Sequence, residues 1–156
     1  MTEFYDFIKN YISAKFSADT DIVAEVAVVD ADISGFRPSS TKNEVYCQII
    51  DVYENEPTTT FSMGETASVV AMQFTSFASK QKIAGEMKNA RQVARIFGDK
   101  IKQYLNELKI NATPNKNIIG CRHTTTSPVL PFQDGEKIYT TAVRYEFVVN
   151  TPYVGK

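Results

Sequence analysis

The sequence predicts one α+β domain over residues 1–156, with a short N-terminal helix and one long central helix packed on a mostly antiparallel sheet. Two segments carry apolar residues at spacings of three and four, the period of a helix. The segments on either side of the second, longer helix alternate apolar and polar residues with the period of a strand. A chain of 156 residues is long enough to bury a sizeable core.

The short helix occupies the start of the chain. Its apolar residues share one helical face, and they are Phe4, Phe7, Ile8, Tyr11 and Ile12. The acidic residues Glu3 and Asp6 lie in its first turn, where negative charge suits the helix dipole. We expect this helix to end near Lys15, before a polar stretch.

Three strands are expected between the helices, over residues 22–29, 45–53 and 67–77. The first is rich in valine. The second is apolar on both of its alternating faces, which predicts a place inside the sheet. The second and third are consistent with an antiparallel pair. Residues 30–43 and 54–64 are polar connectors that contain proline.

The long helix is expected from Lys82 to Lys109, with Ser79 as its N-cap. At about 1.5 Å per residue it would be roughly 40 Å long. One face is apolar and includes Ile83 and Met87, whereas the other carries Arg91 and Arg95. The basic face is interpreted as a solvated face, with an acidic partner or DNA as the alternative.

Two strands complete the chain, over residues 117–126 and 137–151. The second alternates over most of its length. Between the two lies a linker with the strong turn signal Asp134-Gly135.

The charge balance excludes some functions. There are 17 basic and 18 acidic residues, which argues against a dedicated nucleic-acid binder. No apolar run approaches the roughly 20 residues of a membrane span, so no membrane partner is expected. The acidic and aromatic start does not resemble an export signal. Cys47 and Cys121 are therefore interpreted as reduced core residues.

Catalytic and metal-binding patterns are weak. Cys121 and His123 would share one face of a strand, but a closed zinc site needs four ligands and no second cluster exists. Neither glycine-rich phosphate-binding pattern occurs. We therefore expect no metal, no cofactor and no enzymatic activity, and a small enzyme that uses His123 and a carboxylate remains the alternative.

Two runs of threonine, at residues 58–60 and 124–126, are polar, β-prone and uncharged. They are interpreted either as solvated loops and strand edges or as segments that pair with a neighbouring subunit.

The order of elements, with Arg37-Pro38 in a loop that leads to the strand Val45-Tyr46, resembles the tail-terminator and neck proteins of long-tailed bacteriophages. In the neck-terminator group a proline-containing loop leads into an aromatic-bearing strand, and here an insertion separates the two parts. The resemblance implies a virion structural protein that forms a ring, expected to be a hexamer. Such a ring caps the tail tube, joins it to the head-completion proteins and lets DNA pass without specific binding.

A ring subunit needs two different, complementary surfaces. The long loops are the candidate surfaces, because aromatic and apolar side chains gather in them. The candidate interface residues are Phe36, Arg37, Pro38, Phe61, Met63, Leu130 and Phe132. Folding back of these side chains onto the sheet is the competing interpretation. A head-completion stopper or a baseplate component is the alternative role in the same particle.

Overall fold

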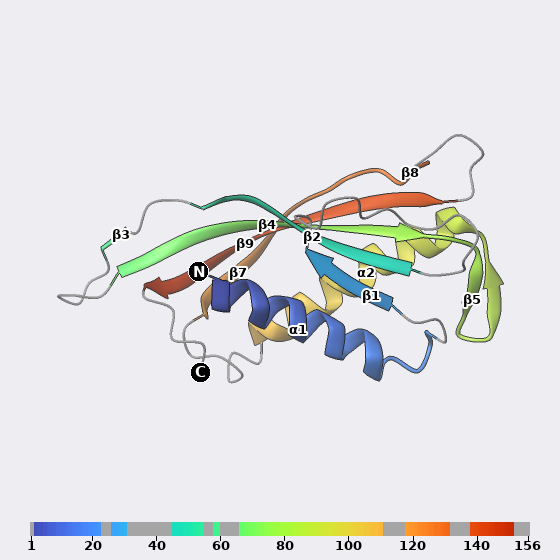
Figure 1. Cartoon of the computed structure of the whole chain (residues 1–156), viewed down its shortest axis with the longest axis horizontal. Coiled ribbons are helices and arrows are strands. Elements are labelled where there is room, and N and C mark those ends of the chain that lie inside the picture. Colours follow the sequence, from blue (N-terminus) through green and yellow to red (C-terminus); the bar gives the residue numbers. More distant parts are fainter. Residues whose placement is uncertain are drawn as a thin grey trace.

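The computed structural model describes residues 2–22, 26–30, 45–54, 58–59, 66–110, 118–131 and 138–151. Within them the chain forms two helices and a mixed but mainly antiparallel sheet, which confirms the predicted α+β class. Figure 1 shows an elongated sheet with both helices on the same side of it.

The main sheet has the order β1-β2-β4-β9-β7, and the short strands β3 and β8 pair with β4 and β9. Its strands are β1 (Val26–Asp30), β2 (Val45–Glu54), β3 (Thr58–Thr59), β4 (Thr66–Ala78), β7 (Ile118–Thr126), β8 (Leu130–Pro131) and β9 (Tyr139–Thr151). Only the β1–β2 pair is parallel. The predicted antiparallel pairing of β2 with β4 is confirmed, and β2 has a neighbour on each side, as its two apolar faces predict.

The two longest strands, β4 and β9, form the spine of the sheet. They pair along their full length, from Thr66 opposite Thr151 to Ala78 opposite Tyr139. Beside this spine, β3 continues the line of β2 along β4, and β8 continues the line of β7 along β9. The sheet therefore has two distant ends, one at Thr66 and one at Ala78.

Helix α1 (Thr2–Ala18) runs one turn further than the sequence predicts. The reason is Phe16, which continues the buried series of Phe4, Ile8 and Ile12. Its ring stacks on Phe97 with centroids 5.2 Å apart. This packing joins α1 to the second helix, α2 (Ala90–Ile110).

The core lies between the two helices and one face of the sheet. The apolar stripe of α2 meets inward-facing residues of β4 and β9. Its largest fully buried side chains include Phe97, Ile101, Leu105, Phe74, Tyr145 and Phe147. Cys121 is also buried there and is in no disulfide, as predicted, whereas the side chain of Cys47 lies outside the described residues.

The predicted start of the long helix at Lys82 is wrong. Residues 81–88 form a hairpin of β5 (Gln81–Ile83) and β6 (Glu86–Lys88). Its two turn residues, Ala84 and Gly85, have φ of 52° and 83°, the left-handed values that a tight hairpin turn uses. Ile83 is buried but Met87 is 55% exposed, so these two residues share no helical face.

Helix α2 begins after Asn89, not after the predicted cap Ser79. The Asn89 side chain accepts a hydrogen bond from the Gln92 backbone N–H at 2.9 Å, and the Gln92 side chain accepts one from the Asn89 N–H at 3.1 Å. This reciprocal arrangement satisfies two amide donors at the helix start.

A partly buried ionic cluster holds the end of α1 to α2. The Asp19 carboxylate accepts hydrogen bonds from the Lys100 ammonium and, at 2.7 Å, from the Tyr104 hydroxyl. Burial alone would raise the pKa of the Asp19 carboxyl, but these hydrogen bonds outweigh it and lower that pKa. The cluster is structural, since it lies under the helix junction.

Candidate interaction surfaces

Of the predicted interface residues, only Leu130 lies within the described part of the chain. It sits in β8 with 53% of its surface exposed, so it does not fold back onto the sheet. The other predicted residues, Phe36, Arg37, Pro38, Phe61, Met63 and Phe132, lie outside the described residues.

Strand β7 forms one edge of the sheet. It pairs with β9 on one side, and no other described strand pairs with its outer side. The side chains from Arg122 to Thr126 are all exposed. The threonine run at 124–126 is therefore part of an edge strand, which is one of the two structural alternatives that its composition predicts.

Beyond Thr126 the edge is held in place by Ser127. Its backbone N–H donates to the Ala142 carbonyl, and its side-chain oxygen accepts from the Ala142 N–H, both at 2.8 Å. The Thr141 hydroxyl donates to the Ser127 carbonyl at 3.2 Å. These bonds fix the short break between β7 and β8, so the edge is ordered before any partner arrives.

The helix-free face of the sheet carries a row of paired polar side chains. Arg122 on β7 meets Glu146 on β9 at 2.6 Å. Arg144 on β9 donates through Nε to the Gln73 amide oxygen on β4 at 2.8 Å. Because these pairs cross neighbouring strands, they stabilise the sheet itself. The charge of Arg122 is paired with that of Glu146, whereas Gln73 is neutral and does not compensate the charge of Arg144.

A groove of about 380 Å³ lies between the N-terminal half of α2 and the edge segment 126–129. Its lining includes Arg91, Arg95, Thr126, Ser127, Pro128 and Val129. A second hollow, of about 400 Å³, adjoins Arg91 and is lined by Asn89, Ala90 and Tyr139 as well. The Arg91 guanidinium lies over the Tyr139 ring, 5.6 Å from its centroid.

The two groove arginines are one helical turn apart and both are exposed. Among the described residues, no carboxylate forms an ion pair with either of them. Asp99 also lines the groove, but its carboxylate pairs with Lys102 at 3.3 Å instead. The groove therefore presents two guanidinium groups that lack an anionic partner in this part of the chain.

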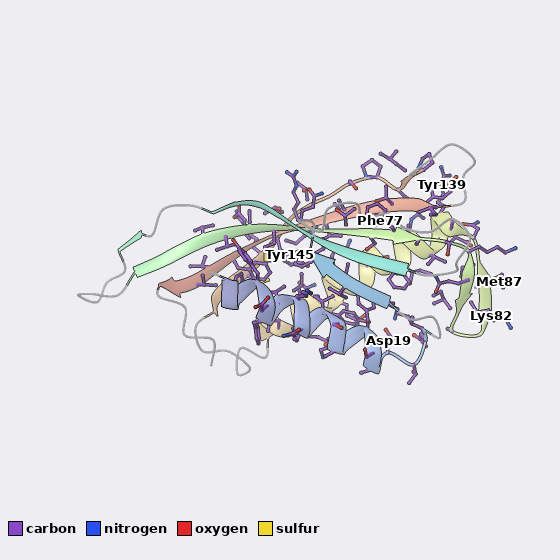
Figure 2. All side chains as sticks on the ribbon, in the orientation of Figure 1. Asp19, Phe77, Lys82, Met87, Tyr139 and Tyr145 are labelled. Carbon is purple, nitrogen blue, oxygen red and sulfur yellow. The ribbon has the colours of Figure 1, made fainter. Side chains whose placement is uncertain are left out.

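The β5–β6 hairpin projects at the same end of the sheet. Figure 2 shows Lys82 and Met87 on it, at the right-hand end of the molecule. Lys80 and Lys82 are exposed, while Lys88 pairs with Glu86 at 3.0 Å. We call the groove and this hairpin together the basic end. Two exposed apolar side chains, Met87 and Leu130, accompany its positive charge.

Cys121 and His123 do share one face of β7, as the strand period predicts, but their surroundings differ. The Cys121 sulfur is buried 4.0 Å from the Leu105 carbonyl. His123 is exposed, and its Nε2 and the Thr126 hydroxyl are 2.7 Å apart. Within the described residues, no three histidine, cysteine, aspartate or glutamate side chains are grouped so as to hold a metal ion.

The hydroxyl of Tyr145, on the same covered face, donates to the Lys102 carbonyl at 3.3 Å. Burial raises the pKa of this phenol to about 12. It stays protonated at neutral pH and packs in the core beside α2.

The sequence-based interpretation placed Arg91 and Arg95 on a basic helix face, with an acidic partner as one alternative, but it missed the hairpin and the groove. Placing residues 82–89 on a helix put Met87 on a buried stripe. The signals that identify the hairpin are the Ala84-Gly85 turn and the Asn89–Gln92 capping pair. The groove itself is formed by α2 and residues 126–129 together, and no local sequence pattern predicts that these two segments meet.

No protein-family model matches this chain, and no curated protein matches it. In the part of the chain that the structure describes, neither helix is long and apolar enough to cross a membrane.

Proposed function

We propose that this chain is a virion structural protein, a tail terminator or closely related neck protein of a long-tailed bacteriophage. Its copies form a ring, expected to be a hexamer, that caps the tail tube and joins it to the head-completion proteins. DNA passes through the ring without specific binding. The chain's chemistry is assembly rather than catalysis.

The observation that carries this proposal is the exposed edge of β7 at residues 124–126, which lies between the charged Arg122 and the prolines Pro128 and Pro131. An edge strand without a partner invites a strand from another chain, and soluble proteins usually block such edges with charge, proline or a covering element. Here the run from Thr124 to Thr126 is uncharged and β-prone, and Leu130 is exposed just beyond it. These properties favour a subunit interface along this edge.

The test compares assembly of the natural chain with that of an edge variant, using light scattering after size-exclusion chromatography. Thr125→Lys places a charge in the middle of the exposed edge, and we expect it to give a folded monomer. Asn10→Lys, on the exposed side of α1, is the matched control and should assemble normally. A natural chain that stays monomeric, both alone and with the tail-tube protein of its particle, would refute the proposal.

A stopper or baseplate component would also form a ring. Labelled antibody on intact particles separates these roles, since a terminator marks the head-proximal end of the tail tube. The enzymatic alternative is tested by His123→Ala: lost activity with a retained fold would support an enzyme, whereas normal particle assembly would remove that alternative.

A further inference from the structure

The Ala78 end of the sheet carries positive charge. At the Ala78 end, four exposed cations have no ion-pair partner among the described residues: Lys80, Lys82, Arg91 and Arg95. The groove that holds the two arginines also offers the apolar surfaces of Pro128 and Val129. A partner for this end therefore needs both carboxylates and apolar side chains.

The connector at the other end has that composition. Residues 55–65, together with Glu54 at the end of β2, contain three glutamates, Glu54, Glu56 and Glu65, and no lysine or arginine. They also contain Phe61 and Met63. The connector follows β2 and precedes β4, and β3 within it pairs with the first residues of β4. Figure 1 places β3 and the β5 hairpin at opposite extremes of the molecule.

Chain geometry prevents the connector from reaching the groove of its own copy. Thr59 and Thr66 are paired, which anchors both ends of residues 60–65. An out-and-back path of six residues extends roughly 12 Å at most. The groove residue Thr141 lies opposite Ser76, ten residues along β4 from Thr66, a distance of about 33 Å at ~3.3 Å per residue.

We propose that the acidic connector of one copy of this chain binds in the basic groove of a second copy. The glutamates of the connector meet Arg91 and Arg95, and its apolar side chains pack on Pro128 and Val129. This inference rests on the proposed function and names the contact that builds the ring. A contact between unlike surfaces, repeated around an axis, closes into a ring.

A protein occupant suits this end better than nucleic acid does. Met87 and Leu130 stand exposed beside the cations, and phosphates gain nothing from apolar neighbours. The overall charge of −1 points the same way, because phosphate binding depends on a basic excess. Binding of duplex DNA at the groove in place of the connector would contradict the assignment.

The first test exchanges charge between two variants. Arg91→Glu/Arg95→Glu reverses the groove, and Glu56→Lys/Glu65→Lys reverses the connector. Each variant alone should be monomeric in light scattering, because like charges then meet. An equimolar mixture should assemble, since every groove again faces a connector of opposite charge. Assembly of either variant alone as well as the natural chain, or a mixture that stays monomeric, would overturn the inference.

The second test works without any ring. A fluorescent peptide of residues 54–65 is titrated into the full-length connector variant Glu56→Lys/Glu65→Lys, whose groove is intact. We expect saturable binding that falls about tenfold or more when Arg91→Glu/Arg95→Glu is added. Equal binding to both receptors, or no saturation, refutes the groove assignment. The two proposals can fail separately. If Thr125→Lys abolishes the ring but the peptide does not bind to the groove, this inference is refuted and the proposed function stands.

Discussion

Helix α2 comes unusually close to the sheet at Gly98, which makes this position a sensitive test of the packing. A methyl group added there would meet Cγ2 of Thr141 at 3.1 Å and Cγ2 of Val143 at 3.7 Å. The first distance is shorter than ordinary contact, whereas the second is not. Gly98→Ala therefore creates one specific clash.

Two opposing effects decide the outcome. Alanine gains about 1 kcal/mol over glycine in a helix interior. Overpacking a well-filled core costs about 1–3 kcal/mol. In the natural background we expect Gly98→Ala to lower the free energy of unfolding by about 0–2 kcal/mol. Thr141→Ser removes Cγ2 while keeping the hydroxyl that bonds to Ser127. In that background Gly98→Ala should instead stabilise by about 1 kcal/mol.

The assay is urea unfolding of the four proteins, followed by circular dichroism, with the results combined as a double-mutant cycle. The expected coupling between positions 98 and 141 is at least about 1 kcal/mol. Gly120→Ala is the control, because nothing lies within 4 Å of its added methyl group, and it should not couple to Thr141→Ser. Coupling below about 0.5 kcal/mol, the usual scatter of additivity, would refute the close approach of α2 to β9.

Three further predictions concern stability. Asn89→Ala should lower the free energy of unfolding in urea by about 1 kcal/mol, because it removes the cap of α2. An unchanged free energy of unfolding would favour a helix that starts before Asn89. Ala84→Asn should raise Tm by roughly 2–4 °C, since asparagine tolerates the left-handed conformation before Gly85. Asp19→Asn should cost about 1–2 kcal/mol at neutral pH by weakening the bond to Lys100. The folded-state pKa of Asp19 is lowered, so its contribution is complete above the unfolded pKa of about 3.9 and disappears as pH falls through the folded value. Unfolding curves of the two proteins should therefore converge in acid.

The strands could be predicted from the sequence because their signals are local. The alternation over residues 67–77 predicts β4 to within one residue at each end. The start of α2 could not be placed by periodicity, since Ile83 and Met87 happen to extend the helical spacing backwards from Ala90. A hairpin forms here instead of a continuous helix from Lys82, because the turn at Gly85 interrupts the helix and Asn89 caps a new one.

The candidate surfaces also differ in whether a local sequence signal predicts them. The exposed threonine strand is a local property, and composition alone suggests it. The groove is not local, because it joins Arg95 to Val129 across more than thirty residues of sequence. Its depth depends on where α2 crosses β9, which is fixed by the close approach at Gly98.

The two proposed contacts adjoin each other, and salt should separate their contributions. Thr126 ends β7 and also lines the groove, so a segment that adds to the edge lies beside the groove at Thr126. Backbone pairing along the edge depends little on ionic strength, whereas the contact with Arg91 and Arg95 is between exposed charges. Screening shortens from about 10 Å at 0.1 M salt to about 3 Å at 1 M.

Raising salt across that range should weaken assembly of the natural chain and strengthen assembly of Arg91→Glu/Arg95→Glu, where the groove repels the connector. Thr125→Lys should remain monomeric throughout, because it blocks the pairing that salt does not affect. Sedimentation velocity at several salt concentrations measures all three. Parallel salt responses of the natural and groove-reversed chains would show that the arginines take no part in assembly. The ring would then depend on the β7 edge alone, and the groove arginines, unpaired within the described residues, would need another explanation.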